Sequence, residues 1–154
     1  MSKIKEVNGN LLTLASEGNF DLIMHGCNCF NTFGAGIALQ IKNLYPSAYL
    51  VDCETTKGDI NKLGNFTKSI QFTNEGEEFT IINAYSQFDF HKENRPFDYE
   101  AFSLICQKIN HLYPKMSIGI PQIGAGLGGG NWENIKEIIT EELSSMKVTI
   151  VYFK

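Results

Sequence analysis

The sequence of 154 residues lacks both a long apolar run and an excess of basic residues. No apolar stretch approaches the ~20 residues that span a bilayer, and the charged start of the chain is followed by no apolar signal core. Lys and Arg total 13 against 17 Asp and Glu, so a broad basic surface for nucleic-acid phosphates is not expected. These absences predict a cytoplasmic protein whose main partner is neither a membrane nor a nucleic acid.

A disulfide framework is also missing, because the four cysteines have no suitable spacing, and this fits a reducing compartment. Cys27 and Cys29 lie close to His25, which could indicate a metal site. However, the usual Cys-x-x-Cys spacing and a second pair of ligands are absent, so we expect no metal and no cofactor. A nucleophilic thiol at Cys27 or Cys29 is a weaker alternative.

Strand-like and helix-like hydrophobic periods alternate along the chain, whose length favours one domain over residues 1–154. Strands are expected over residues 4–7, 11–14, 22–25, 65–71, 80–85, 117–120 and 148–153. Helices are expected over residues 35–45, from Asp98 onward and after Asn131, where both named residues are N-caps. The first two strands are expected to form a hairpin at Asn8-Gly9.

This order of elements predicts an α/β protein with three αβα layers and a largely parallel central sheet, made mixed by the opening hairpin. In such sheets, ligands bind outside the carboxyl ends of the strands, in the loops that lead into helices. Both glycine clusters of this chain fall at such positions. This coincidence is the strongest physical indication of function in the sequence.

The first glycine cluster is formed by Gly34, Ala35 and Gly36, between a strand and a helix. Small residues let main-chain N–H groups approach a ligand, and the helix N-terminus favours negative charge. The second cluster, residues 123–130, lies at a similar junction and could enclose the other side of the same anion. Flexible turns are the alternative. Neither loop is a Walker A motif or a dinucleotide fingerprint.

The sequences around these loops, residues 25–38 and 120–132, resemble the two ligand loops of the macrodomain family. The likeness in element order covers nearly the whole chain. It is strongest to the branch that contains the fungal ADP-ribose-1''-phosphate phosphatase and the terminal ADP-ribose protein glycohydrolase. The resemblance implies a macrodomain that binds ADP-ribose or a derivative of it, and we expect a monomer.

The resemblance also implies roles for individual residues. Asn10 and Leu11 match the turn that meets adenine, with Asn10 replacing the usual Asp, and Tyr152 or Phe153 would stack on the base. The distal ribose would be bordered by Gly34, Ala35 and Gly36, and Ile37 is a further ligand-binding candidate. The diphosphate would be held by main-chain N–H groups of Gly124, Ala125, Gly126, Leu127 and Gly128, and Ile123 is a further ligand-binding candidate.

His25 and Asn28 are the candidate catalytic residues. An imidazole is the natural general acid or base near neutral pH, and Asn28 could orient a water molecule or hold a ribose hydroxyl. A strand-end histidine that is simply hydrogen-bonded in place is the alternative reading of His25. Family members that cleave glutamate-linked ADP-ribose use a Lys and an Asp, for which this chain aligns Ala84 and Gly128, so that mechanism is not expected.

The predicted function is hydrolysis of the phosphate of ADP-ribose-1''-phosphate, with His25 assisting the attack of water. A non-catalytic reader of ADP-ribose and a hydrolase of another ADP-ribosyl linkage are the alternatives. The charged segment from Asp89 to Arg95 follows a strand and could carry an acid or base over the site, although a solvated surface loop has the same composition.

Overall fold

The computed structural model describes residues 4–89, 97–125 and 129–154. The strands are β1 (Lys5–Gly9), β2 (Leu22–Cys27), β3 (Phe66–Phe72), β4 (Glu78–Tyr85), β5 (Ser117–Pro121) and β6 (Lys147–Phe153). The helices are α1 (Leu11–Ser16), α2 (Gly36–Leu44), α3 (Pro46–Cys53), the short 3-10 helix η1 (Ile60–Lys62), α4 (Tyr99–Leu112) and α5 (Trp132–Glu142).

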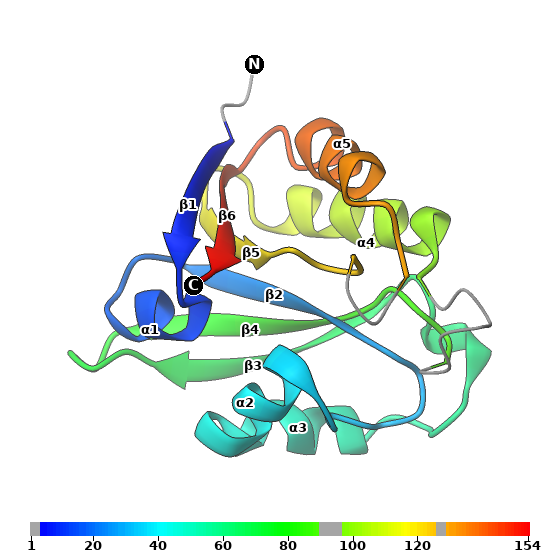
Figure 1. Ribbon diagram of the computed structural model, residues 1–154. Helices are drawn as coiled ribbons and strands as arrows, with labels where there is room; N and C mark the ends of the chain where they lie inside the picture. The colour runs from blue at the N-terminus through cyan, green and yellow to red at the C-terminus, as the bar shows by residue number, and fades with distance from the viewer. Residues whose placement is uncertain (1–3, 90–96, 126–128) are drawn as a thin grey trace.

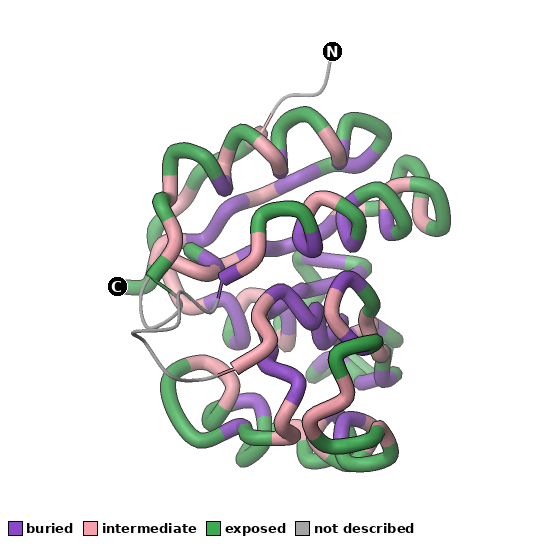
Figure 2. Tube along the Cα trace, turned by 90° about the vertical axis from the view of Figure 1, so that its right-hand side faces the viewer, coloured by how far each residue is buried: buried purple, intermediate pink, exposed green. Residues whose placement is uncertain are grey.

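The strands form one six-stranded sheet in the order β1-β6-β5-β2-β4-β3. All neighbours are parallel except β3, which runs antiparallel to β4 at one edge. Helices α4 and α5 cover one face of the sheet, and α1, α2 and α3 cover the other (Figure 1). The buried residues concentrate in the strands between the two helical layers (Figure 2). The predicted three-layer architecture is therefore confirmed.

The predicted opening hairpin is wrong, because residues 11–16 form helix α1 rather than a strand. Asn10 caps this helix, and its Oδ1 accepts hydrogen bonds from the main-chain N–H groups of Leu12 and Thr13 at 3.0 and 3.1 Å. Strand β1 pairs instead with β6, in parallel. The mixed character of the sheet comes from the β3–β4 hairpin, whose two strands were predicted.

Helix α3 is absent from the predictions, since the expected helix ends at residue 45 and no helix is expected between there and Asp98. Proline is favoured in the first turn of a helix, where its missing N–H is not needed, and Pro46 begins α3. The N-caps Asp98 and Asn131 are confirmed. No helix in the described ranges has the length and apolarity needed to cross a membrane.

Two apolar cores lie on opposite faces of the sheet. One packs β2, β4, β5 and β6 against α4 and α5, and the other packs the opposite sheet face against α1, α2 and α3. Strand β2 leads into α2 on the second face, whereas its neighbour β5 leads into α5 on the first. Such a change of side between adjacent strands opens a crevice at their carboxyl ends.

Candidate functional site

A cavity of about 600 Å³ lies at the point where the chain leaves β2 and β5 toward opposite faces. Its wall contains residues 26–28 at the end of β2, residues 34–38 at the start of α2, and residues 121–124 after β5, together with Thr32 and Gln87. We call it the switch-point pocket. Its volume is in the range of small-molecule sites.

A second cavity of about 470 Å³, the β6-end pocket, lies beside the first. It is lined by the start of α1, the end of β6 and the side of α2. The two pockets have four lining residues in common, namely Gly36, Ile37, Pro121 and Gln122. Together they make an elongated site along the carboxyl edge of the sheet.

The first glycine cluster leaves the N-terminus of α2 open toward both pockets. The N-cap residue is Ala35, so within the described residues no side chain caps the first N–H groups of this helix. Gly36 has a φ of 57°, which favours glycine, and a Cβ at Gly34 or Gly36 would meet no atom within 4 Å. Free N–H groups beside open space form a site for an anion.

The second glycine cluster is folded against Phe97. Gly124 has a φ of 75°, and a Cβ on it would collide with the ring of Phe97. The N–H of Gly130 donates to the carbonyl of Gly124 at 2.7 Å and closes the loop. Ile123 and Gly124 line the switch-point pocket, whereas Ala125 does not. The remaining predicted residues of this loop, Gly126, Leu127 and Gly128, lie outside the described residues.

The residues predicted to meet adenine all line the β6-end pocket: Asn10, Leu11, Tyr152 and Phe153. The Oδ1 atom of Asn10 is occupied by its capping bonds, so its amide N–H groups are the part available to a ligand. Phe153 is 74% exposed, and Leu11 is buried beneath the pocket.

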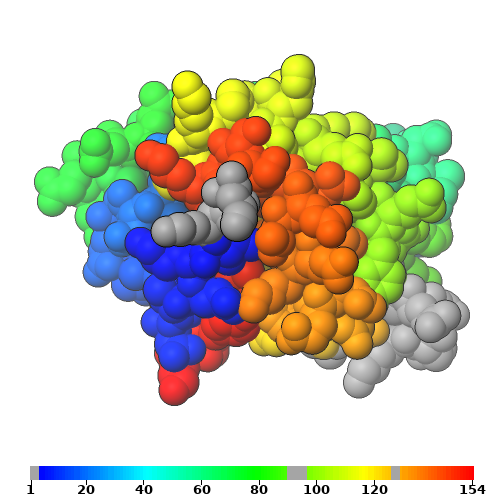
Figure 3. All heavy atoms as spheres, turned by 90° about the horizontal axis from the view of Figure 1, so that it is seen from above, coloured from blue at the N-terminus to red at the C-terminus, as the bar shows by residue number. Residues whose placement is uncertain are grey.

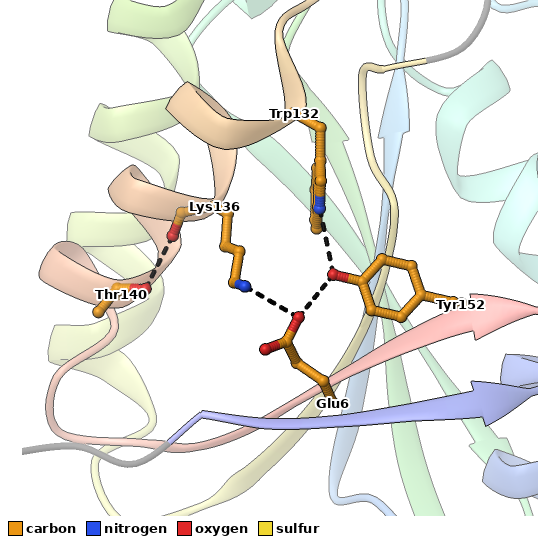
Figure 4. A network of polar contacts seen from close by, with 5 residues as sticks. All are labelled: Glu6, Trp132, Lys136, Thr140 and Tyr152. Carbon is orange, nitrogen blue, oxygen red and sulfur yellow. Dashed lines mark hydrogen bonds and ion pairs between the residues drawn. The ribbon is translucent and has the colours of Figure 1, made fainter.

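Tyr152 is held by a polar network that joins β1, β6 and α5 (Figure 4). Its hydroxyl donates to Oε1 of Glu6 at 2.7 Å and accepts from Nε1 of Trp132 at 3.1 Å, while Nζ of Lys136 lies 2.9 Å from the same carboxylate oxygen. The hydrogen bonds from Tyr152 and Lys136 lower the pKa of Glu6. Helix α5 lies directly beside β1 at this place (Figure 3). The network therefore connects the end of the second glycine loop, at Trp132, with the β6-end pocket.

His25 does not line either pocket and is fully buried. Its Nε2–H donates to Oδ1 of Asn83 at 2.7 Å, and the Asn83 amide donates to the Ala48 carbonyl and to Thr67, which fixes these roles. Burial lowers the pKa of His25 to about 4. The imidazole is therefore neutral near pH 7 and has no access to a ligand, which speaks against the general acid–base role.

Cys27 lines the switch-point pocket, but its thiol does not form a nucleophile–base pair with His25. The sulfur lies 3.8 Å from Nδ1 and 3.5 Å from Nε2. Nearly equal distances to both ring nitrogens place it over the face of the imidazole, whereas the lone pair that could accept a proton lies in the ring plane. Burial also raises the pKa of the Cys27 thiol. The thiol is therefore held in its unreactive form.

Asn28 does line the switch-point pocket, as do three polar residues that the sequence analysis missed: Thr32, Gln87 and Gln122. Oδ1 of Asn28 accepts from the N–H of Phe30 at 2.8 Å, and its amide donates to Thr32 at 2.6 Å. Ala84 is buried within β4, and Gln87 is the residue after this strand that reaches the pocket. Among the described residues, no Asp, Glu, Lys, Arg or His lines either pocket. Of the charged segment after β4, residues 90–96 lie outside the described residues.

No family model matches the chain, but individual proteins and solved structures are similar to it. The chain is 32% identical to an uncharacterized 17.5 kDa protein of Enterobacteria phage T4, over 96% of this chain and 95% of that protein. It is 28% identical to the ADP-ribose 1''-phosphate phosphatase of Saccharomyces cerevisiae, over 97% of this chain and 98% of the phosphatase.

Solved structures with the same fold include a macrodomain and a protein in complex with ADP-ribose. The macrodomain of Thermus aquaticus DarG superposes with a TM-score of 0.73 at 23% identity, over 100% of this chain and 99% of that one. Thermosipho africanus DarTG, solved in complex with ADP-ribose, has a TM-score of 0.77 at 14% identity, over 100% of this chain and 42% of that one. With its six-stranded, mostly parallel sheet and its two strand-end loops, the chain belongs to the macrodomain family.

Proposed function

We propose that this protein binds ADP-ribose along the two adjoining pockets and hydrolyses the phosphate of ADP-ribose-1''-phosphate. The observation that carries the proposal is the shared wall of the pockets at Gly36, where the open N-terminus of α2 lies between an aromatic end and an amide-lined end. ADP-ribose has the same order of parts: a base, a diphosphate and a distal ribose.

In this arrangement the adenine lies in the β6-end pocket, where Phe153 offers an aromatic face and the amide of Asn10 can pair with the edge of the base. The diphosphate lies at the N-terminus of α2 and the start of the second glycine loop, where main-chain N–H groups replace basic side chains. The distal ribose then lies in the switch-point pocket beside Asn28 and Gln87.

The hydrolytic part of the proposal rests on the likeness to the yeast phosphatase over nearly the whole of both chains. Water attacks the phosphorus as the bond from phosphorus to the anomeric oxygen breaks, one proton of the water passes to the ribose oxygen, and inorganic phosphate leaves. Asn28 and Gln87 would orient the water and the ribose, since neutral amides can position reactants without exchanging protons. Oriented main-chain N–H groups would stabilise the charge on the phosphoryl group.

A second candidate is a reader that binds ADP-ribose without hydrolysing its derivatives. The observation that favours it is the neutral lining of the switch-point pocket, which offers no general acid or base among the described residues. The two candidates share the binding site and differ only in turnover. Hydrolysis of another ADP-ribosyl linkage would appear as turnover on a different substrate.

Phosphate release from ADP-ribose-1''-phosphate tests the proposal, with ADP-ribose calorimetry on the same samples. We expect the wild type to release phosphate, Asn28→Ala to lose at least about 10-fold in rate, and His25→Gln to stay within about threefold, because the His25 ring is sealed from the pocket. Binding without phosphate release would favour the reader. A loss of about 100-fold in folded His25→Gln would restore His25 as a proton-transfer residue.

A further inference from the structure

The loop between β2 and α2 is held from behind by a buried lysine. Asn28 and Thr32 of this loop line the switch-point pocket, and the three residues between them do not. Nζ of Lys62, the last residue of η1, donates to the carbonyl of Cys29 at 3.1 Å and to Oδ1 of Asn31 at 2.6 Å. Lys62 thus binds two of the three residues that separate the pocket-lining pair.

Asn31 is the point at which these contacts meet. It has a φ of 58°, a left-handed conformation that is uncommon for a residue other than glycine. Besides Lys62, its side chain contacts the carbonyl and the hydroxyl of Thr55 at 3.2 and 3.3 Å, and its own carbonyl accepts from the hydroxyl of Tyr49 at 3.2 Å. Together these bonds hold Asn31 in a backbone conformation that would otherwise be unfavourable in free energy.

The burial of Lys62 costs free energy, because its charged group loses contact with water. The side chain is buried, and its Nζ lies 4.9 Å from the centre of the Tyr85 ring. The Tyr85 hydroxyl donates to Oδ1 of buried Asp52 at 2.6 Å, while Oδ2 of Asp52 has no partner among the described residues. An apolar side chain would fill this space without the cost of desolvating a charge, so packing alone does not explain a lysine here.

We propose that Lys62 is a positioning residue that holds the β2–α2 loop in its ligand-binding conformation. It acts through Cys29 and Asn31, and it presents Asn28, Thr32 and the residues after them to the distal part of the ligand. A loop fixed before binding loses less conformational entropy when the ligand arrives. The proposal rests on ADP-ribose as the ligand, and it adds the residue that prepares the distal half of the site.

The experiment compares Lys62→Met and Asn31→Gly with a matched control, Lys108→Met. Lys108 makes the same pair of bonds, to the carbonyl of Gly64 at 3.0 Å and to Oδ1 of Asn65 at 2.6 Å, in a loop that lines neither pocket. Asn31→Gly removes the side-chain acceptor and keeps a residue that tolerates the left-handed backbone. Affinities for ADP-ribose and AMP are measured for each protein, because AMP reaches only the adenine half of the proposed site.

We expect Lys62→Met and Asn31→Gly to bind ADP-ribose about 10-fold more weakly than the wild type, with AMP affinity within about twofold. Lys108→Met should leave both affinities unchanged. If folded Lys62→Met binds ADP-ribose like the wild type while its Tm falls, Lys62 serves only stability and the proposal is overturned.

Amide hydrogen exchange separates a failure of this proposal from a failure of the proposed function. If Lys62 holds the loop, exchange at residues 29–33 is faster in Lys62→Met than in the wild type and unchanged in Lys108→Met, with no ligand present. This result would stand even if the wild type failed to bind ADP-ribose. Unchanged exchange at residues 29–33 would contradict the positioning role directly.

Discussion

Nε2 of His25 donates a 2.7 Å hydrogen bond to Oδ1 of Asn83, in the interior between β2 and β4. The bond links two paired residues of neighbouring strands, and the His25 ring also packs edge-on against Phe33, with ring centroids 5.1 Å apart. Phe33 directly precedes the first glycine cluster. His25 thus supports the loop at the pocket from within the core.

The burial of His25 predicts a loss of stability in acid. An unfolded chain would protonate near the ordinary pKa of 6.5, whereas burial lowers the pKa in the folded protein to about 4. The contribution of neutral His25 is therefore complete above pH 6.5 and is lost as the pH falls toward 4, amounting to about 3 kcal/mol in the free energy of unfolding. Urea unfolding at pH 7 and pH 4.5 measures the loss.

His25→Gln provides the control for this prediction, because glutamine can keep a donor toward Asn83 and does not titrate. The difference between the two pH values should shrink in this variant, while the contributions of other groups, such as Asp52, remain. An equal loss in both proteins would show that another group causes the acid sensitivity.

Phe153→Ala tests the adenine end of the site. Phe153 is 74% exposed at the rim of the β6-end pocket, so its removal should cost the fold little. Loss of a stacking partner is worth about 1–3 kcal/mol, so we expect AMP and ADP-ribose to bind about 5- to 150-fold more weakly. Phe72→Ala is a matched control, since Phe72 is also exposed at the end of a strand but lines neither pocket. Equal affinities for all three proteins would remove Phe153 from the site.

Ser86→Ala should stabilise the protein. Oγ of Ser86 is buried and has no hydrogen-bond partner among the described residues, so the hydroxyl costs desolvation without gaining a bond. We expect the free energy of unfolding to rise by about 1 kcal/mol. Ser69→Ala is the contrasting change, because Oγ of Ser69 accepts from Gln71 at 3.0 Å and its loss should destabilise the protein. A Ser86→Ala protein that unfolds more easily than the wild type would mean that the hydroxyl is satisfied in solution.

Much of the fold could be predicted because the relevant signals are local. Asp98 and Asn131 cap helices through their own side chains, and the β3–β4 hairpin follows from alternating strands around a glycine turn. The segment after Asn10 was misread, because a short buried helix and a buried strand have the same apolar composition and only the capping bonds distinguish them. Helix α3 was missed for a similar reason, since Pro46 can end one helix or begin the next.

The site could be predicted where its chemistry lies in the main chain, and less well where it lies in side chains. Glycines that follow a strand indicate an open loop at the strand end, so Gly34, Gly36 and Gly124 could be assigned to the pocket from the sequence. Whether the His25 side chain points into the core or toward the pocket depends on the face of the sheet on which it lies. Its partner Asn83 is 58 residues away in the sequence. Gln87 belongs to no motif, Gln122 was given no role within the second loop, and only the fold brings them to one pocket.

The most direct test of the account is ADP-ribose calorimetry on the wild type, Gly36→Leu and Gly76→Leu. Both glycines have positive φ angles and open space around them, but Gly36 lies in the shared wall of the two pockets and Gly76 lies in the β3–β4 turn. We expect the wild type to bind, Gly76→Leu to bind within about twofold of it, and Gly36→Leu to lose at least about 30-fold in affinity. No binding by the wild type, or equal binding by both folded variants, would contradict an ADP-ribose site at the N-terminus of α2.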